Sequence, residues 1–206
     1  MSVHLVDHSL AQHTLLQLRS ATASPSRFRR LAFRLSWMIG YEATRDLATE
    51  PATVEGPLEV ASGVRLLRSI VIVPVLRAGL AMIDPILELV PEARVGHIGL
   101  QRDERTAVAS RYYMKLPPVG PETTVLLVDP MLATGGSALA ALDLLHDAGA
   151  ADVRLVVVVA APEGLAAVQQ AWPAIAIYTA AIDRELDPRK FILPGLGDFG
   201  DRLYGT

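Results

Sequence analysis

Four consecutive residues, Val156–Val159, are all apolar, and they lie inside a longer apolar run, Leu155–Ala161. A strand that is apolar on both faces has to be covered on both faces, which is typical of the centre of a parallel sheet. From residue 69 onward, other short apolar runs alternate with segments whose apolar residues have helical spacing. Strands that alternate with helices over short connections predict an α/β fold, in which helices flank a parallel sheet.

The same patterns give the expected elements. We expect strands at Ser69–Val75, Val95–Leu100, Thr124–Val128, Val153–Ala160 and Ile175–Tyr178. We expect helices between them at Gly79–Leu89, Gly136–Ala148 and Glu163–Ala171. Earlier in the chain we expect a helix over residues 8–20, a second from Ser24-Pro25 to about Leu47, and a short ribbon over Thr53–Val60. Residues 101–123 are polar apart from one strand candidate, Tyr112–Leu116, and so long a loop is usually functional.

The composition excludes several classes of protein. Of 206 residues, 51% are hydrophobic and 20% charged, so we expect a buried core rather than a disordered or fibrous chain. Lys and Arg total 19 against 22 Asp and Glu, which leaves no broad basic surface for a nucleic acid. Cysteine is absent, which excludes disulfides, thiolate metal sites and cysteine nucleophiles. No apolar run approaches the roughly 20 residues of a membrane helix, so we expect no membrane partner and a cytoplasmic location.

The most informative segment runs from Val125 to Ser137. A buried strand ends in the carboxylate of Asp129, and the turn Thr134–Ser137 then opens a helix. Its two glycines let successive backbone N–H groups point inward, and the start of the helix adds positive potential, so the turn predicts a cradle for one phosphate group. Asp129 can accept hydrogen bonds from vicinal sugar hydroxyls. Each feature alone fits an ordinary strand end or turn, but together they favour a sugar phosphate at the carboxyl edge of the sheet.

Two other interpretations of this segment fail on the sequence. An ATP-type phosphate loop needs a Lys directly after its last glycine, and none follows Gly136. A nucleophile elbow needs a glycine two residues on each side of the Ser, but Leu139 occupies the second of these places.

The segment Val128–Ser137 resembles the phosphoribosyl-pyrophosphate (PRPP) motif of the uracil phosphoribosyltransferases, a branch of the type I phosphoribosyltransferases. Most type I members have two adjacent acids here, and Pro130 in the second place is similar to the uracil-specific branch. Four more segments are similar to this family, in the family's order: Tyr41–Leu47, Pro74–Leu80, Ala161–Gly164 and Pro194–Asp198. The resemblance implies that PRPP contacts Asp129, Pro130, Met131, Leu132, Ala133, Thr134, Gly135, Gly136 and Ser137.

Two arginines follow predicted strands and should emerge at the same sheet edge as the motif. Arg77 follows the run Ile70–Leu76, and Arg102 follows the strand Val95–Leu100. Two guanidinium groups there could hold a diphosphate through paired donors, which is the role that the resemblance implies. The next stretch, Asp103–Arg111, resembles the family's mobile substrate-covering loop, although Arg105 stands where an acid is usual.

The carboxyl-terminal segment Gly195–Gly200 matches Gly-x-Gly-x-x-Gly, but Pro194 precedes it and no βαβ unit follows, which excludes a dinucleotide site. Extended glycine-rich backbone can instead match the carbonyl and N–H groups of a planar base, and a cytosine would leave such groups unpaired. The resemblance implies uracil contacts from Ile192, Gly197, Asp198 and Phe199, and a PRPP contact from Asp198. Residues 178–183 are similar to a further family segment and would line the same pocket.

The resemblance implies one type I phosphoribosyltransferase-like domain over residues 1–206. Its parts would be amino-terminal helices and a β-ribbon over 1–60, the core sheet over 69–180 and a uracil-binding segment over 181–206, with both chain ends forming a small hood. The implied reaction converts uracil and PRPP into UMP and diphosphate, a pyrimidine salvage step. Asp129, Arg77, Arg102 and Asp198 are the implied catalytic residues.

The sequence contains no all-protein metal cage, as suits Mg²⁺ held by substrate phosphates and water. A homodimer or larger homo-oligomer could bury the apolar area of the amino-terminal helices and ribbon. Some members of the family respond to GTP, and the sequence leaves open whether this chain does. A nucleotide-sensing RNA-binding regulator on the same fold is an alternative that the acidic charge balance disfavours. A transferase for another base is a second alternative, and the segment Pro194–Asp198 disfavours a purine.

Overall fold

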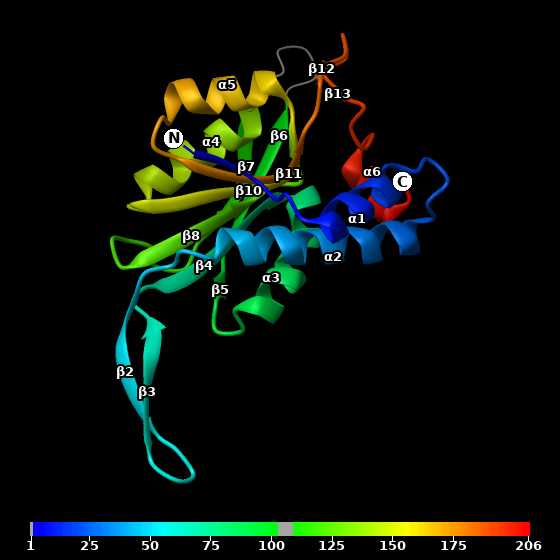
Figure 1. Cartoon of the computed structure of the whole chain (residues 1–206). Helices are drawn as coiled ribbons and strands as arrows, with labels where there is room; N and C mark the ends of the chain where they lie inside the picture. Colours follow the sequence, from blue (N-terminus) through cyan, green and yellow to red (C-terminus); the bar gives the residue numbers. More distant parts are fainter. Residues whose placement is uncertain (1, 103–108) are drawn as a thin grey trace.

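The computed structural model describes residues 2–102 and 109–206 and has a mostly parallel central sheet (Figure 1). The strand order is β1-β11-β10-β8-β4-β6-β7, and only the β6–β7 pair at one edge is antiparallel. The strands are β1 Ser2–Leu5, β4 Ser69–Leu76, β6 His97–Arg102, β7 Ala109–Lys115, β8 Thr123–Val128, β10 Asp152–Ala160 and β11 Ala176–Ile182. Two short strands, β5 Arg94–Val95 and β9 Met131–Leu132, pair with β4 and β10. The predicted α/β fold is confirmed.

Helices cover both faces of this sheet, as the all-apolar central strands require (Figure 1). The helices are α1 Ser9–Arg19, α2 Pro25–Ala43, α3 Ile83–Leu89, α4 Gly136–Asp147, α5 Pro162–Ala171 and α6 Phe199–Tyr204, with a 3₁₀ turn, η1, at Ala78–Met82. Alternate residues of each strand point to opposite faces. Ile72 therefore joins the core under α1, α2 and α6, and Val73 joins the core under α4 and α5. The run Val156–Val159 is fully buried between these two cores, as predicted.

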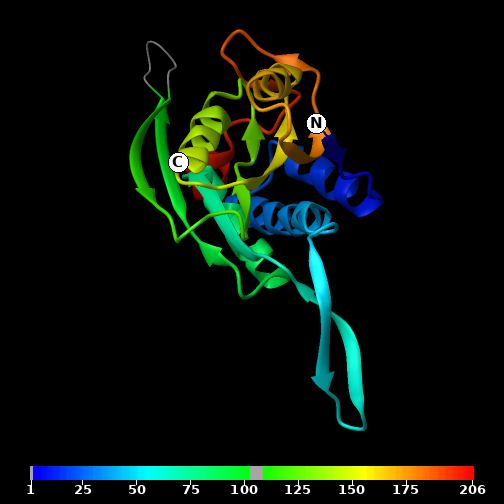
Figure 2. The ribbon, with the colours of Figure 1, turned by 90° about the vertical axis from the view of Figure 1, so that its left-hand side faces the viewer.

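The ribbon of β2 (Thr49–Glu55) and β3 (Val60–Leu66) projects away from the body of the molecule (Figure 2). It is longer than the expected ribbon over Thr53–Val60, because antiparallel pairing continues in register from Glu55↔Val60 back to Thr49↔Leu66. All seven residues of β3 are exposed. A ribbon without a covered face has no core to signal its length in the sequence.

Several element boundaries differ from the prediction, each for a local reason. Helix α2 ends at Ala43 rather than near Leu47, because the Thr44 N–H bonds the carbonyl three residues back, at Tyr41, while the Thr44 hydroxyl donates to the carbonyl of Gly40. The single expected helix Gly79–Leu89 divides into η1 and α3, and Pro85 lies in the first turn of α3, where a proline is tolerated. The strand candidate Tyr112–Leu116 extends back to Ala109 as β7.

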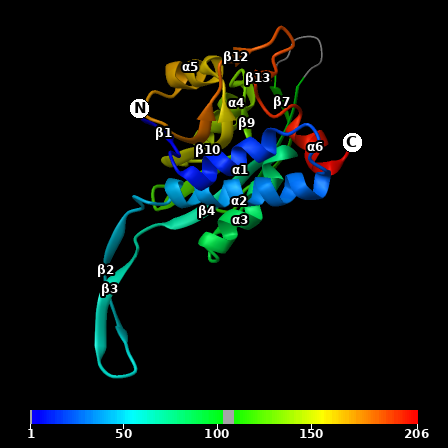
Figure 3. The ribbon, with the colours of Figure 1, turned by 45° about the vertical axis from the view of Figure 1, so that its right-hand side comes forward.

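The amino terminus adds an edge strand, β1, that the sequence analysis did not predict; Ser2 pairs with Ala176 of β11. The carboxyl terminus forms a small antiparallel pair, β12 Glu185–Leu186 and β13 Ile192–Leu193, followed by α6. Helix α6 packs on α2, where the rings of Phe28 and Phe199 meet edge to face at 5.0 Å between centroids (Figure 3). The carboxyl-terminal helix therefore lies against the amino-terminal helix α2, whereas the two chain ends lie apart on opposite sides of the molecule (Figure 3).

Within the described parts of the chain, no helix combines the length and the apolar character that a membrane span requires. The expected cytoplasmic location stays a prediction.

Candidate active site

The site begins with two neighbouring strands that end at the same edge of the sheet. β4 and β8 are paired up to Pro74↔Val128, so Arg77 and Asp129 both follow directly at the carboxyl edge. This is the edge at which open α/β sheets bind ligands. Arg102 is the last residue of β6, which pairs with the end of β4. The side chain of Arg102 and residues 103–108 of the expected covering loop lie outside the part of the chain that the structure describes.

A cavity of about 330 Å³ at this edge brings together most of the residues predicted from the sequence. The predicted residues that line it are Arg77, Asp129, Met131, Ala133, Ser137, Ile192, Gly197, Asp198 and Phe199. An adjoining crevice shares four of these residues and extends to Leu132 and Gly135. Pro130, Thr134 and Gly136 line neither space: Pro130 is buried, and its carbonyl accepts hydrogen bonds from β10.

The predicted phosphate turn precedes the 12-residue helix α4, and no side chain caps the start of that helix. Its N-cap residue, Gly135, has a φ of 85°, in the left-handed region that favours glycine. Gly135, Ser137 and Ala138 line the crevice, so the positive end of the helix dipole lies beside this side of the cavity. This is the arrangement by which helix starts bind phosphate groups.

The backbone of the turn is held from behind by the start of α5. Gly164 lies so close that a Cβ atom there would be 2.5 Å from the carbonyl oxygen of Ala133 and 2.8 Å from that of Leu132. The Leu132 carbonyl also accepts a hydrogen bond from the N–H of Ala161, at 2.9 Å. The shape of the turn therefore depends on a close approach that only glycine permits.

Across the cavity, η1 is held against the end of β8 in a similar way. A Cβ atom on Gly79 would lie 2.5 Å from the carbonyl oxygen of Val128, so this glycine also allows close packing. The side chain of Arg77 is exposed, and its guanidinium carbon lies 5.9 Å from the centre of the Tyr204 ring. The Tyr204 hydroxyl donates to the Arg77 carbonyl at 3.5 Å. The carboxyl-terminal helix α6 therefore contacts the arginine that follows β4.

Residues of the segment 192–200, which the sequence predicts to contact the base, form a second wall of the cavity, here named the base-side wall. Gly195 and Gly197 have φ angles of 59° and 71°, which turn the backbone twice within three residues. The ring of Phe199 is buried in the core, so only its backbone is available to a ligand, as the sequence analysis expected of this position. Asp198 is the N-cap of α6, and its Oδ1 accepts a hydrogen bond from the N–H of Asp201 at 2.8 Å.

The expectation that residues 178–183 line the pocket is wrong. Tyr178 is 3% exposed, and its ring stacks on that of His4 at 4.5 Å between centroids. Burial raises the pKa of the Tyr178 phenol, against a smaller opposing effect of Arg154. Asp183 is also buried. Its carboxylate binds Arg19 and the N–H of Gly195, and it does not line the cavity. Within this segment, Asp183 supports the cavity wall at Gly195 from outside the cavity.

Lys190 and Phe191 also line the cavity beside Ile192, although the sequence did not predict them as site residues. Lys190 has a φ of 69°, and the carboxylate of Asp187 accepts the N–H groups of Arg189 and Phe191, both at 2.8 Å. Hydrogen bonding from the Phe191 N–H lowers the pKa of the Asp187 carboxyl. An Asp followed by Pro, as in Asp187-Pro188, is a turn signal that could have indicated this tight loop.

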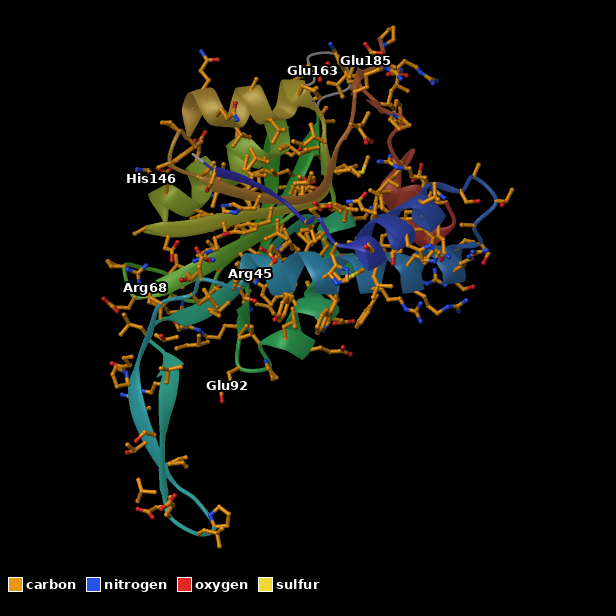
Figure 4. All side chains as sticks on the ribbon, in the orientation of Figure 1. Arg45, Arg68, Glu92, His146, Glu163 and Glu185 are labelled. Atoms are coloured by element: carbon orange, nitrogen blue, oxygen red, sulfur yellow. The ribbon has the colours of Figure 1, made fainter. Side chains whose placement is uncertain are left out.

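A second acid holds the same segment from α5. The Glu163 side chain reaches from the start of α5 toward β12, next to Glu185 (Figure 4), and accepts the N–H of Leu186 at 3.0 Å. This backbone hydrogen bond lowers the pKa of the Glu163 carboxyl. The wall opposite the phosphate turn is thus tied to the helix that supports that turn.

Among the described residues, no cluster of three or more His, Asp or Glu side chains could hold a metal ion. Asp129 and Asp198 are the two acids lining the cavity, and one or two carboxylates together with substrate phosphates are what Mg²⁺ commonly uses. The oxygen donors present therefore fit Mg²⁺ bound with a phosphorylated substrate.

The chain is similar to known proteins along nearly its whole length. Residues 5–206 match the family model described as uracil phosphoribosyltransferase. Curated uracil phosphoribosyltransferases from Rhodococcus opacus and Thermus thermophilus are 48% and 49% identical, respectively. Each alignment covers 100% of this chain and 99% and 100%, respectively, of the relative.

Solved structures give the same result for the fold. A protein of Aquifex aeolicus has a TM-score of 0.95 and 34% identity, with 100% of this chain and 99% of that chain covered. A hypoxanthine phosphoribosyltransferase from Trypanosoma cruzi, complexed with the product IMP, has a TM-score of 0.52 and 13% identity over 77% of this chain and 76% of that chain. At that identity the likeness concerns the fold alone.

Proposed function

The chain belongs to the uracil phosphoribosyltransferase family, and from this premise we propose how its carboxyl-edge cavity divides the work of the reaction. The enzyme is a pentosyltransferase that converts uracil and PRPP into UMP and diphosphate. The observation that carries the assignment is one cavity that joins an acid after β8, an arginine after β4 and the glycine-rich wall 192–200.

The phosphate turn and its neighbouring acid would hold the sugar phosphate. The 5′-phosphate lies against the backbone of Ala133–Ser137 at the start of α4, and Asp129 accepts hydrogen bonds from the ribose hydroxyls. The connection between Asp129 and the phosphate turn is short. It contains the buried Pro130, followed by Met131 and Leu132, which pair with β10. The ribose is thereby held at both ends.

The diphosphate would lie toward Arg77, with Arg102 as its second cationic partner. Arg77 is placed by the close packing of Gly79 on the end of β8 and by contact with the Tyr204 ring. The guanidinium groups neutralise the charge that grows on the departing diphosphate, which is electrostatic stabilisation of the transition state. When bound, Mg²⁺ would supply further charge neutralisation at the diphosphate, with Asp129 and Asp198 as the available carboxylate ligands.

Uracil would lie against the backbone of Ile192 and Gly197–Phe199, with Asp198 placed between base and PRPP. Its N1 attacks the anomeric carbon while the bond from that carbon to the diphosphate oxygen breaks, through a state with oxocarbenium character. Asp198 is the candidate acceptor of the ring proton that N1 loses. The protein works chiefly by orienting the two reactants and by neutralising the departing diphosphate, and the backbone of this wall excludes bases with the wrong donor pattern.

A base panel tests this assignment. The purified protein is assayed with labelled uracil, cytosine, hypoxanthine and adenine, each with and without PRPP and Mg²⁺. We expect nucleotide formation only from uracil, and only when both PRPP and Mg²⁺ are present. Equal turnover of hypoxanthine, or binding of RNA without UMP formation, would refute the proposal.

We propose that the protein is a homodimer or a larger homo-oligomer. The β2–β3 ribbon carries apolar side chains with large exposed fractions, including 65% for Val54, 97% for Leu58 and 69% for Val64. A two-stranded ribbon is marginal on its own, and a second copy could cover this surface. Light scattering on the wild type and on Leu58→Ser measures the oligomeric state of each protein. A monomeric wild type would contradict the proposal.

Activation by GTP is a proposal supported only by the family. It is measured by adding GTP at low and at saturating PRPP, and an unchanged rate at both would exclude it.

A further inference from the structure

The base-side wall contains a turn whose backbone needs an external support. Residues 194–198 have neither helical nor strand hydrogen bonding, and Gly195 lies between the two backbone segments assigned to uracil. A Cβ atom on Gly195 would be 2.0 Å from the carbonyl oxygen of Ile192, so these two residues are in close contact. A displacement of Gly195 would therefore disturb Ile192, and Gly197 follows two residues later in the same turn.

One ion pair binds both polar groups of the Gly195 backbone. Oδ2 of Asp183 accepts the N–H of Gly195 at 2.9 Å, and Nη1 of Arg19 donates to the Gly195 carbonyl at 2.8 Å. The two side chains also bind each other twice, through Nη1 to Oδ2 at 2.9 Å and Nη2 to Oδ1 at 2.7 Å. Their exposed fractions are only 20% for Arg19 and 5% for Asp183. Two parallel hydrogen bonds between a guanidinium and a carboxylate fix the relative orientation of the two side chains as well as their distance.

The two partners come from elements that are far apart in the chain. Arg19 is the last residue of α1, and Asp183 directly follows β11, which is bonded to two neighbours in the central sheet. The turn is thus attached to the sheet on one side and to the amino-terminal helix on the other. Both supports are rigid elements.

A second arginine holds the next residue of the turn. Nη1 of Arg202, in α6, donates to the carbonyl of Leu196 at 2.7 Å, and Nη2 donates to the carbonyl of Ser20. The guanidinium lies over the Phe28 ring at 4.3 Å from its centre. Burial lowers the pKa of Arg202 from its ordinary value. Arg19 and Arg202 therefore hold the successive carbonyls of Gly195 and Leu196, and Arg202 also binds the carbonyl of the residue that follows Arg19.

We propose that Arg19 and Asp183 are positioning residues for uracil: they hold the Gly195 backbone so that the flanking segments keep the donor and acceptor pattern that selects this base. The proposal rests on the assignment of uracil to this wall. Neither side chain lines the cavity, so neither is a catalytic residue. Apart from Asp198, which is fixed separately as the N-cap of α6, the PRPP groups lie on other elements, at the ends of β4 and β8 and in the turn before α4, and should not depend on the pair.

The test compares Asp183→Asn with a control variant, Asp152→Asn. Asp152 also binds an arginine, Arg68, at 3.1 Å, and accepts the Thr124 hydroxyl at 2.7 Å, but it begins β10 and so lies at the other end of the sheet. Figure 4 shows Arg68 near the root of the ribbon, away from Glu163 and the site. Both variants keep the shape of the side chain and remove one charge from an ion pair.

We expect Asp183→Asn to raise KM for uracil about tenfold, because loss of one charge-assisted contact is of that size, and to reduce the preference for uracil over cytosine. KM for PRPP should stay within about twofold, as expected for independent sites. The control should lower Tm and leave both KM values unchanged. Arg19→Lys keeps the charge but cannot make both hydrogen bonds to Asp183, so it should give a smaller rise in KM for uracil. If Asp183→Asn does not fold, Arg19→Lys tests the same proposal.

Two results would overturn the proposal: a fall in Tm with KM for uracil unchanged, or an equal rise in KM for uracil and for PRPP. Failure of the wild-type protein to make UMP would instead refute the proposed function, and this is read from the unmutated protein in the same assay.

Discussion

Gly164 offers a direct test of the phosphate turn, because it touches the backbone of the turn but lines neither the cavity nor the adjoining crevice. In Gly164→Ala, the new methyl carbon would lie 2.5 Å from the carbonyl oxygen of Ala133. Ordinary contacts of this kind begin near 3.4 Å, so the turn or the start of α5 has to move by about 0.9 Å. The Ala133 carbonyl belongs to the turn, whereas α5 is held by buried side chains at Leu165 and Val168. The turn is the part that should yield.

The expected effect on activity follows from that displacement. A misplacement of about 1 Å in a group that orients a reactant can cost about a hundredfold in rate. We therefore expect kcat/KM for PRPP to fall between about tenfold and a hundredfold, while KM for uracil changes little. Overpacking of this size typically costs about 1–3 kcal/mol, so Tm should fall by several degrees while the protein remains folded.

Gly63→Ala is the matched control, because a Cβ atom there would meet nothing within 4 Å. It should leave both KM values and kcat unchanged. Initial rates over a series of PRPP concentrations, with circular dichroism to verify folding, give the comparison. A folded Gly164→Ala enzyme with the kcat/KM of the wild type for PRPP would refute the reasoning that this turn holds the 5′-phosphate.

Three other changes test separate parts of the structure. Asp129→Asn should abolish most turnover while changing Tm little, because the acid lines the cavity rather than the core; near-normal UMP formation would rule out its role. Arg77→Ala should weaken PRPP binding far more than uracil binding in calorimetry, and equal losses for both ligands would contradict its contact with diphosphate. Asp46→Asn should reduce Tm at neutral pH: burial opposes ionisation of Asp46, but the hydrogen bond and charge of Arg154 prevail and lower its pKa. Because the pKa of Asp46 is lower in the folded protein, its ionised form stabilises the fold above the unfolded-state pKa of about 4. This stabilisation is lost as the pH falls through the folded-state pKa, so the difference in Tm between wild type and variant should shrink in acid. If the difference in Tm did not depend on pH, the ion pair between Asp46 and Arg154 would be excluded as the source of that difference.

The sheet could be predicted because its signals are local. Val156–Val159 has no polar residue in four, and burial on both faces is the physical condition that permits such a run. Arg77 and Asp129 were found for the same reason: each is the first charged residue after an apolar run, so the end of the strand gives its place at the edge. The phosphate turn was found because Gly135 is needed where the backbone takes a positive φ.

The base-side wall was predicted less completely because its support is long-range. Arg19 and Asp183 are separated by 164 residues, and neither has a neighbour in sequence that marks it as a partner. Residues 178–183 looked like pocket residues because of their similarity to the family, yet Tyr178 points into the core and Asp183 toward Gly195. The strand β1 was missed for a related reason: its four residues are only partly covered, and only its pairing with β11 makes it a strand.

The two halves of the site thus differ in how the chain builds them. The groups assigned to PRPP come from the ends of β4 and β8, so the sheet that forms the core also places them. The wall assigned to uracil has no regular structure of its own, and its turn is held by Arg19 and Arg202, which lie near opposite ends of the chain. Because α1 and α6 both pack on α2, these supports depend on the same helical layer. Disturbance of that layer should therefore impair selection of the base before it impairs binding of the sugar phosphate.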